Sequence, residues 1–198
     1  MSKKILYFLA VSSLFLFSGC AKYKPSQIPF PSGEKQKANN IKIVTRKLSD
    51  KEVKICFDSQ KLSKKYDAVQ IYVKNNSDKT IILNAQQISL PVISAKEICK
   101  TTYRETAARI TSYAIPGFFL WPFWIPAIID GQKSSKANEQ IDQDVSVKVL
   151  ATNDNKSIKP NNHINKIAFI PKGYNTKEFA IKLVDKNLKT ASKFICNA

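Results

Sequence analysis

The chain has a single histidine, and the residues around it do not indicate catalysis. His163 follows Pro160-Asn161-Asn162, residue types that are typical of a turn, so an exposed loop position is expected. The sequence contains no GxSxG, HExxH or P-loop spacing and no CxxC pair, the patterns that would indicate a nucleophile, a zinc site or a phosphate cradle. We therefore predict no catalytic residue, no metal site, no cofactor and no enzymatic activity.

Three cysteines in the body of the chain can carry thiol chemistry. Cys99 falls on the apolar face of an expected helix, which favours a buried thiol. Cys56 alternates with Lys54 and Asp58 on the polar side of an expected strand, and Cys196 lies two residues from the end of the chain. Three cysteines allow three single pairings. We predict a Cys56–Cys196 disulfide, which would secure the last strand in an oxidising compartment.

Two of the three arginines lie close together in a chain that otherwise uses lysine. Arg104 and Arg109 fall on an expected helix, where Glu105 is four residues before Arg109 and can pair with it across one turn. Arginine also binds phosphate and carboxylate groups through two parallel hydrogen bonds. Two interpretations stay open: a salt bridge on the helix face, or an anion clamp made by Arg104 and Arg109 beside a membrane.

The start of the chain has the three parts of an export signal. Lys3 and Lys4 are followed by residues 5–17, an uncharged and mostly apolar run that is too short to span a bilayer as a helix. The run ends in Phe17-Ser18-Gly19-Cys20. This tetrapeptide resembles the lipobox of bacterial lipoproteins, in which a large apolar residue and two small ones precede the cysteine that becomes the lipidated N-terminus.

The resemblance implies how the protein is processed and where it resides. Residues 1–19 would be a signal peptide that is removed, and Cys20 would be acylated and anchored in a membrane of the cell envelope. Ala21 is not the aspartate associated with inner-membrane retention in lipoproteins of enteric type, which favours the outer membrane, facing the periplasm. The order of parts further along the chain, with Ile88-Ser89-Leu90-Pro91 before an apolar stretch, also resembles an uncharacterised group of small bacterial envelope proteins, which implies no activity.

The charge of the chain is strongly positive but is not distributed as in nucleic-acid-binding proteins. Cleavage before Cys20 would remove two lysines and lower the formal net charge from +17 to +15. Of 32 basic residues 29 are lysines, scattered singly along the chain, whereas nucleic-acid surfaces cluster their charge and favour arginine. We therefore expect no nucleic-acid partner, and membrane surfaces or cell-wall polymers remain plausible partners.

Most of the chain alternates apolar and polar residues as half-buried strands do. Residues 20–40 have several prolines and no such period, and we expect them to form a lipidated tether of up to roughly 60 Å. From Ile41 onward, a period of two predicts strands at 41–43, 53–57, 69–73, 80–83, 145–149, 167–169 and 179–183. The polar run 74–79 predicts a hairpin turn. We expect one domain over 41–198, an immunoglobulin-like antiparallel β-sandwich.

The middle of the chain interrupts this pattern, at about residues 94–143. Ser94-Ala95-Lys96-Glu97 is a capping box that predicts a helix from Ser94 to about Tyr113. Residues 110–129 are uncharged, and Ser134 or Ser135 can cap a short second helix. The fold class is therefore mainly β, with a helix–apolar loop–helix insertion.

The apolar loop is the candidate contact site. Its prolines argue against a regular membrane-spanning helix. Its side chains could contact a membrane or an apolar ligand, could complete the core, or could meet another protein. The residues concerned are Phe118, Phe119, Leu120, Trp121, Phe123, Trp124 and Ile125.

The sequence favours a membrane-anchored envelope lipoprotein that acts as a non-enzymatic binding or scaffolding module. Its partners would be the membrane, through Cys20, and an envelope protein. A carrier of an apolar ligand and an envelope hydrolase are the alternatives. A closed apolar cavity would favour the carrier, and a cleft with paired carboxylates would favour the hydrolase.

Overall fold

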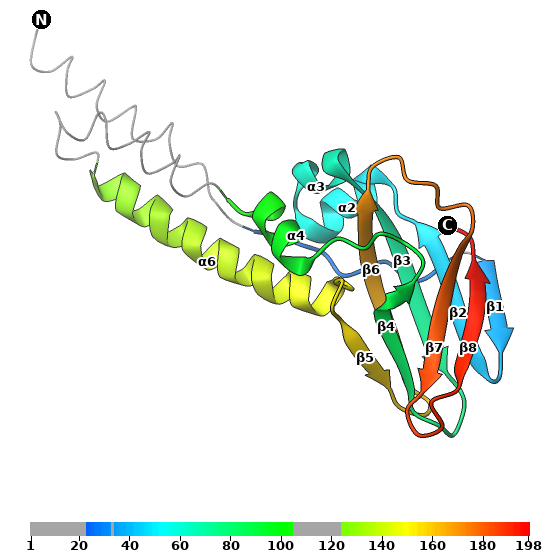
Figure 1. Ribbon diagram of the computed structural model, residues 1–198. Coiled ribbons are helices and arrows are strands. Elements are labelled where there is room, and N and C mark those ends of the chain that lie inside the picture. Colours follow the sequence, from blue (N-terminus) through cyan, green and yellow to red (C-terminus); the bar gives the residue numbers. More distant parts are fainter. Residues whose placement is uncertain (1–22, 33, 105–123) are drawn as a thin grey trace, which may run out of the picture. The chain divides into compact units, whose positions relative to one another are not determined.

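The computed structural model of this protein describes residues 23–32, 34–104 and 124–198. The chain divides into two units, Met1–Tyr23 with Tyr103–Ile141, and Lys24–Thr102 with Asp142–Ala198. The second unit is mainly β, with two four-stranded antiparallel sheets (Figure 1). Helix α6 (Trp124–Lys148) begins in the first unit and ends in the second.

The two sheets have a sandwich-like arrangement. In sheet A the strand order is β1 (Glu34–Ala38), β2 (Ile41–Lys47), β3 (Tyr66–Asn75), β6 (His163–Pro171); in sheet B it is β5 (Asn155–Ile158), β4 (Ile81–Ile88), β7 (Phe179–Asp185), β8 (Ala191–Cys196). One apolar core contains Ile43 and Ile71 from sheet A and Leu83 and Ile181 from sheet B. The alternating pattern therefore predicted the mainly β class correctly, because residues two apart share one face of a strand.

The connection after β3 crosses from one sheet to the other. The predicted hairpin is wrong, because β3 belongs to sheet A and β4 to sheet B. Asn75 is fully buried and fixes the crossing: its Nδ2 donates to the carbonyl oxygens of Lys79 (2.6 Å) and Ile158 (3.0 Å), and its Oδ1 accepts from the backbone N–H of Ser77 (3.0 Å). The polar residues did mark a turn, but a turn signal does not specify which sheet the next strand joins.

The segment predicted as a strand at 53–57 is a helix instead. In α2 (Asp50–Phe57), Ser49 and Glu52 form a capping box, which satisfies backbone N–H groups that have no partner inside the helix. The buried residues Val53, Cys56 and Phe57 have helical spacing. A short helix, α3 (Gln60–Lys65), follows and leads into β3.

Helix α4 (Ala95–Thr102) begins as predicted and ends earlier. Ser94 Oγ accepts from the backbone N–H of Glu97 at 3.3 Å. Arg104 lies after the helix and not on it. The hydroxyl of Thr102 donates back to the carbonyl oxygen of Ile98 at 2.8 Å, a side-chain bond that competes with helix continuation.

Helix α6 is longer than the expected second helix, and it contains most of the segment predicted as a strand at 145–149. It is described from Trp124 onward. The buried residues Ile141 and Val145 are four apart, so the valine spacing of two was misleading. No helix among the described residues is both long enough and apolar enough to cross a membrane.

The segment expected to be a tether is partly ordered against the β domain. Residues 35–38 pair with β2 as part of β1. Residues 24–32, which we call the N-terminal strap, are hydrogen-bonded to α2, α6, β3 and β6. Prolines suppressed the strand and helix signals of this segment, but they left its carbonyl groups free to accept hydrogen bonds from side chains.

Candidate functional site

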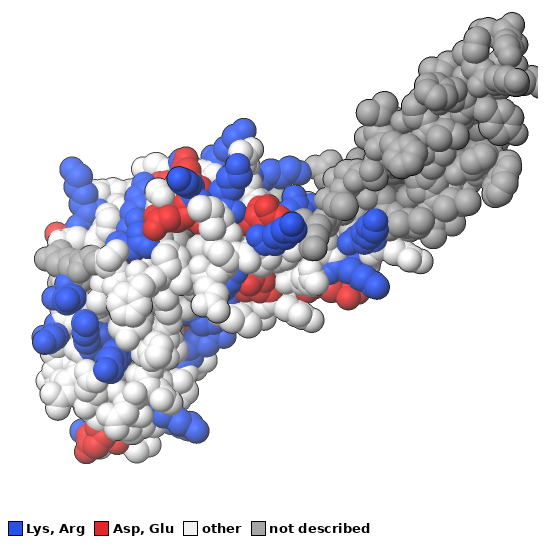
Figure 2. Space-filling model, turned by 180° about the vertical axis from the view of Figure 1, so that it is seen from behind, with Lys and Arg blue, Asp and Glu red and all other residues white. Residues whose placement is uncertain are grey.

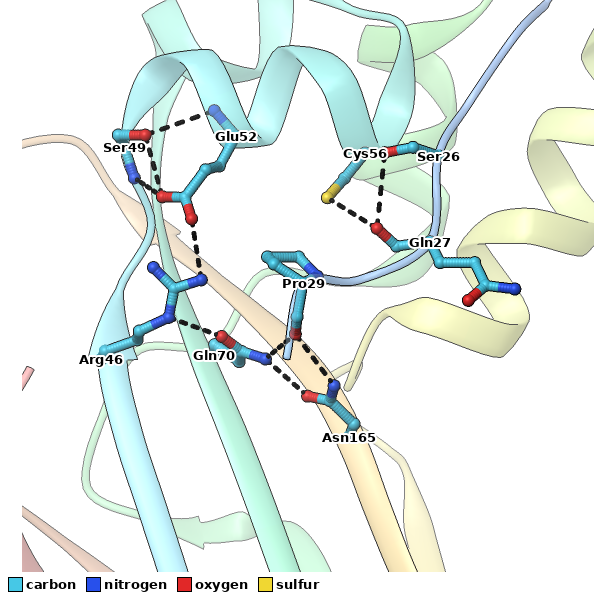
Figure 3. A network of polar contacts seen from close by, with 9 residues as sticks. All are labelled: Ser26, Gln27, Pro29, Arg46, Ser49, Glu52, Cys56, Gln70 and Asn165. Carbon is cyan, nitrogen blue, oxygen red and sulfur yellow. Dashed lines mark hydrogen bonds and ion pairs between the residues drawn. The ribbon is translucent and has the colours of Figure 1, made fainter. Parts of the chain in front are cut away.

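The N-terminal strap is fixed by a polar network on the outer face of sheet A (Figure 3). Gln70 is its centre and is 1 % exposed. Its Nε2 donates to the carbonyl oxygen of Pro29 at 2.8 Å and to Asn165 Oδ1 at 2.9 Å. Asn165 Nδ2 donates to the same Pro29 oxygen at 3.4 Å, and Arg46 Nε donates to Gln70 Oε1 at 2.8 Å. The buried amide therefore has its donors and its acceptor satisfied, as a buried polar group requires.

Arg46 links this network to the start of α2. Its Nη2 lies 2.8 Å from Glu52 Oε1, while Glu52 Oε2 accepts from the backbone N–H of Ser49 at 2.9 Å. The hydrogen bond from Arg46, together with smaller contributions from Ser49, lowers the pKa of Glu52 to about 2 against the opposing effect of burial. Glu52 is therefore ionised at neutral pH and serves as a fixed acceptor rather than as a proton donor.

A buried lysine holds the other end of the strap. Lys148 is 7 % exposed, and its Nζ donates to the carbonyl oxygens of Ser26 (2.6 Å) and Cys56 (2.9 Å) and to Asp144 Oδ2 (2.8 Å). It also lies 5.6 Å from the ring centre of Phe57. All three N–H donors of the ammonium group are engaged, so Lys148 has a structural role here rather than that of a nucleophile.

The described thiols lie in protected surroundings. Cys56 Sγ lies 3.6 Å from the carbonyl oxygen of Gln27 and is a free thiol, so the predicted Cys56–Cys196 disulfide is not present. The prediction failed because Cys56 is on a helix facing the strap, while Cys196 is in the core between the sheets. Cys99 is a buried thiol as predicted, and burial together with Asp142 raises its pKa to about 12.

A cleft of about 310 Å³ lies at the end of the sandwich where three connections meet. It is lined by the β1–β2 turn, the β3–β4 connection and the β7–β8 turn, with Ile41, Ile81 and Leu183 as its apolar residues. Hydroxyl, amide and charged side chains make up the rest: Asn39, Asn40, Ser77, Asp78, Lys79, Asp185, Thr190 and Ser192. Such a lining suits a polar, hydroxyl-bearing ligand better than a hydrocarbon.

The best-placed carboxylate of the cleft is already used by the fold. Asp185 Oδ1 accepts from the backbone N–H groups of Asn187 (2.8 Å) and Leu188 (3.1 Å), and its Oδ2 lies 3.8 Å from Lys79 Nζ. These backbone bonds and the lysine lower the pKa of Asp185. Asp185 is therefore a fixed anion of the cleft and not a general acid, and Asp78 is the second carboxylate among the lining residues.

The remaining residues singled out from the sequence are placed as follows. Arg104 lies beside Asn138, whose Oδ1 accepts from its backbone N–H at 2.9 Å. Arg109 lies outside the described residues, so the clamp stays a prediction.

His163 is exposed at the start of β6, with its ring 5.5 Å from that of Tyr72. Trp124 and Ile125 begin α6. Cys20 and the loop residues Phe118, Phe119, Leu120, Trp121 and Phe123 lie outside the described residues.

Basic side chains are spread over the face shown in Figure 2, with acidic ones among them. This matches the scattering of lysines along the sequence. Among the described residues there is no cluster of three or more histidine, cysteine, aspartate or glutamate side chains that could hold a metal ion.

Sequence reasoning missed Gln70, Asn165 and Lys148, which hold the strap. A usable signal was present in β3, where Tyr66, Ala68 and Tyr72 lie on the face opposite Val69 and Ile71. Apolar residues on both faces of one strand indicate that both faces are covered.

Comparison of the chain with protein-family models, with curated proteins and with solved structures finds no match.

Proposed function

We propose that this protein is a lipoprotein of the bacterial cell envelope, anchored through Cys20, whose folded part is a non-enzymatic binding or scaffolding module. The outer membrane, facing the periplasm, is the proposed location. We also propose that the sandwich is immunoglobulin-like and that residues 94–143 form a helix–apolar loop–helix insertion. The observation that carries the proposal is the tetrapeptide Phe17-Ser18-Gly19-Cys20 after a charged start and a short apolar run.

The arrangement of the chain supports this reading. Every strand of the two sheets lies downstream of Cys20, so cleavage before that cysteine leaves the β domain intact. The cleft at the loop end combines polar side chains with three apolar ones, and its Asp185 is held as an anion by the fold. A binding module accounts for that chemistry more simply than a hydrolase does.

Mass spectrometry of the mature N-terminus tests the anchor. We expect Cys20 to be the first residue and to carry acyl chains, and Cys20→Ser to abolish acylation and to release or misprocess the protein. Cys99→Ala is the matched control, because it removes a buried thiol and should leave acylation unchanged. An unmodified N-terminus at any other residue contradicts the proposal.

We propose the apolar loop as a second membrane contact. Phe118 to Phe123 with Trp124 and Ile125 combine aromatic and aliphatic side chains, which suits the interface between headgroups and hydrocarbon. Trp121→Ala should then weaken the high-salt-resistant binding of the Cys20→Ser protein to vesicles at nearly unchanged melting temperature. A loss of about 3 to 5 kcal/mol in stability with unchanged binding would instead identify the loop as core.

A further inference from the structure

The N-terminal strap ties the chain to the C-terminal end of α2. The backbone N–H of Lys24 donates to Asp58 Oδ2 at 3.1 Å, and the backbone N–H of Ser26 donates to the carbonyl oxygen of Ile55 at 3.0 Å. A fully extended chain advances by at most about 3.6 Å per residue, so four residues place Cys20 within about 14 Å of Lys24. This inference rests on the proposed acylation of Cys20: given that anchor, α2 is held near the lipid headgroups.

The surface of α2 and α3 has the composition that such a position requires. On α2, Lys51, Lys54 and Ile55 are exposed and lie at spacings of three and four residues, on the side of the helix opposite the buried Val53 and Phe57. Ile55 is 49 % exposed. On α3, the exposed lysines have the same spacing: Lys61, Lys64 and Lys65.

The acidic side chains of α2 are paired with basic ones of the fold, and Asp58 at its C-cap accepts a backbone hydrogen bond. Asp50 lies 3.1 Å from Lys172 Nζ, and Glu52 is paired with Arg46. Asp58 accepts from the backbone of Lys24. By contrast, the described contacts of Lys51, Lys54 and Lys64 include no ion pair. The positive charge of these three side chains is therefore directed to solvent.

We infer that Lys51, Lys54 and Lys64, which we call the α2–α3 lysine face, dock on anionic phospholipid headgroups beside the anchor. Each lysine that lies near an anionic membrane surface increases the affinity of the protein for that surface about fivefold. The anchor adds to this, because a tethered surface meets its partner at high effective concentration. The acyl chains alone would keep the domain at the membrane, and the lysine face would also fix which side of the domain faces the membrane.

This docking would give the cleft a direction. Helices α2 and α3 lie near one end of β3, and the β3–β4 and β7–β8 connections lie at the other end (Figure 1). A strand of ten residues, the length of β3, spans roughly 33 Å. With the lysine face on the membrane, the polar cleft points away from it and stays accessible to a partner in the periplasm.

Lysine acetylation of the mature acylated protein, read by mass spectrometry, tests the docking. Vesicles rich in phosphatidylglycerol are compared with vesicles of pure phosphatidylcholine. We expect Lys51, Lys54 and Lys64 to react about fivefold more slowly on the anionic vesicles. Lys182 and Lys193, exposed cross-strand partners on sheet B, should react equally on both. Equal rates on both vesicles at Lys51, Lys54 and Lys64, or equal slowing at all lysines, would overturn the inference.

A pair of charge-matched variants separates this surface from net charge. Replacing Lys51, Lys54 and Lys64 by Gln should abolish the lipid-dependent protection of Lys65, whereas replacing Lys177, Lys182 and Lys193 by Gln should preserve it. Loss of protection in both variants would show that only total charge matters and would overturn the inference. The mass spectrum also reports whether Cys20 is acylated: an unmodified cysteine rejects the proposed anchor itself, while acylation without lysine protection rejects the docking alone.

Discussion

The two sheets share one core, but their outer faces differ. In sheet A, residues of both faces of β3 are buried over most of the strand, and the outer residues Ile167 and Phe169 of β6 are fully buried. In sheet B, β7 alternates between buried and more exposed residues, and Lys182 lies in the open. Figure 1 shows the helices α2 and α3 beside sheet A. One sheet is thus covered on both sides and the other on one side.

The covered outer face carries its own apolar packing. Phe57 of α2 meets Phe169 edge-on with ring centres 5.3 Å apart, and Tyr66 meets the same ring at 6.3 Å. The strap covers the neighbouring part of this outer face, where the polar residues Gln70 and Asn165 bind the Pro29 carbonyl oxygen. The difference teaches that α2 and the strap are part of the fold.

The largest expected effect is at Phe57, the aromatic centre of the cover. Phe57 is 0 % exposed, so Phe57→Ala should lower the free energy of unfolding by about 3 to 5 kcal/mol, because it leaves a cavity under α2. Ile195→Ala, on the outer face of sheet B where the side chain is 40 % exposed, should cost less than about 1 kcal/mol. Denaturant unfolding measures both. Similar losses would erase the distinction between the two outer faces.

A smaller effect is expected at Gln70. Gln70→Ala removes one of two side-chain donors to the Pro29 carbonyl and leaves Arg46 Nε without its amide acceptor, at a cost of about 1 to 3 kcal/mol. Hydrogen exchange should accelerate at the backbone amides of Lys24 and Ser26, because the strap is less firmly held. Gln60→Ala, at an exposed position of α3, is the control. Unchanged exchange at Lys24 and Ser26 would show that the network does not hold the strap.

The smallest effect concerns pH. The pKa of Glu52 is lowered from 4.5 to about 2 in the folded protein. Its contribution to stability is therefore present above about pH 4.5 and is lost as the pH falls toward 2. The unfolding midpoints of the wild type and of Glu52→Gln should differ at neutral pH and converge over that range. Because the side chain is 32 % exposed, the difference should be modest; a gap that stays constant down to pH 2 would contradict the assignment.

Local patterns predicted those parts of the fold that depend on near neighbours. The strands around Ile43, Ile71 and Ile181 were found because alternation is a property of one strand. Helix α4 was found from Ser94 and Glu97, whose contact spans three residues. The same box at Ser49 and Glu52 was missed, because the alternation of Val53, Ile55 and Phe57 predicted a strand. The buried Cys56 completes a helical face there.

The candidate site was less predictable from sequence. Gln70, Asn165 and Pro29 are far apart in the chain and meet only when β3 and β6 pair and the strap crosses them. The cleft likewise joins turns from β1–β2, β3–β4 and β7–β8. Of these turns, the sequence predicted the polar run 74–79, and nothing local specifies which turns gather at one end.

By itself, the sequence determined the mainly β class, the start of α4, the buried thiol of Cys99 and the positions of several strands, because each depends on the period or the capping chemistry of a few consecutive residues. Tertiary structure decided that β3 and β4 part into different sheets, that α2 is a helix, that Cys56 is a free thiol, and that residues 24–32 lie on the domain. These outcomes depend on side chains such as Asn75 and Lys148, whose partners are distant in sequence. A buried polar group has to find those partners wherever the packed fold provides them.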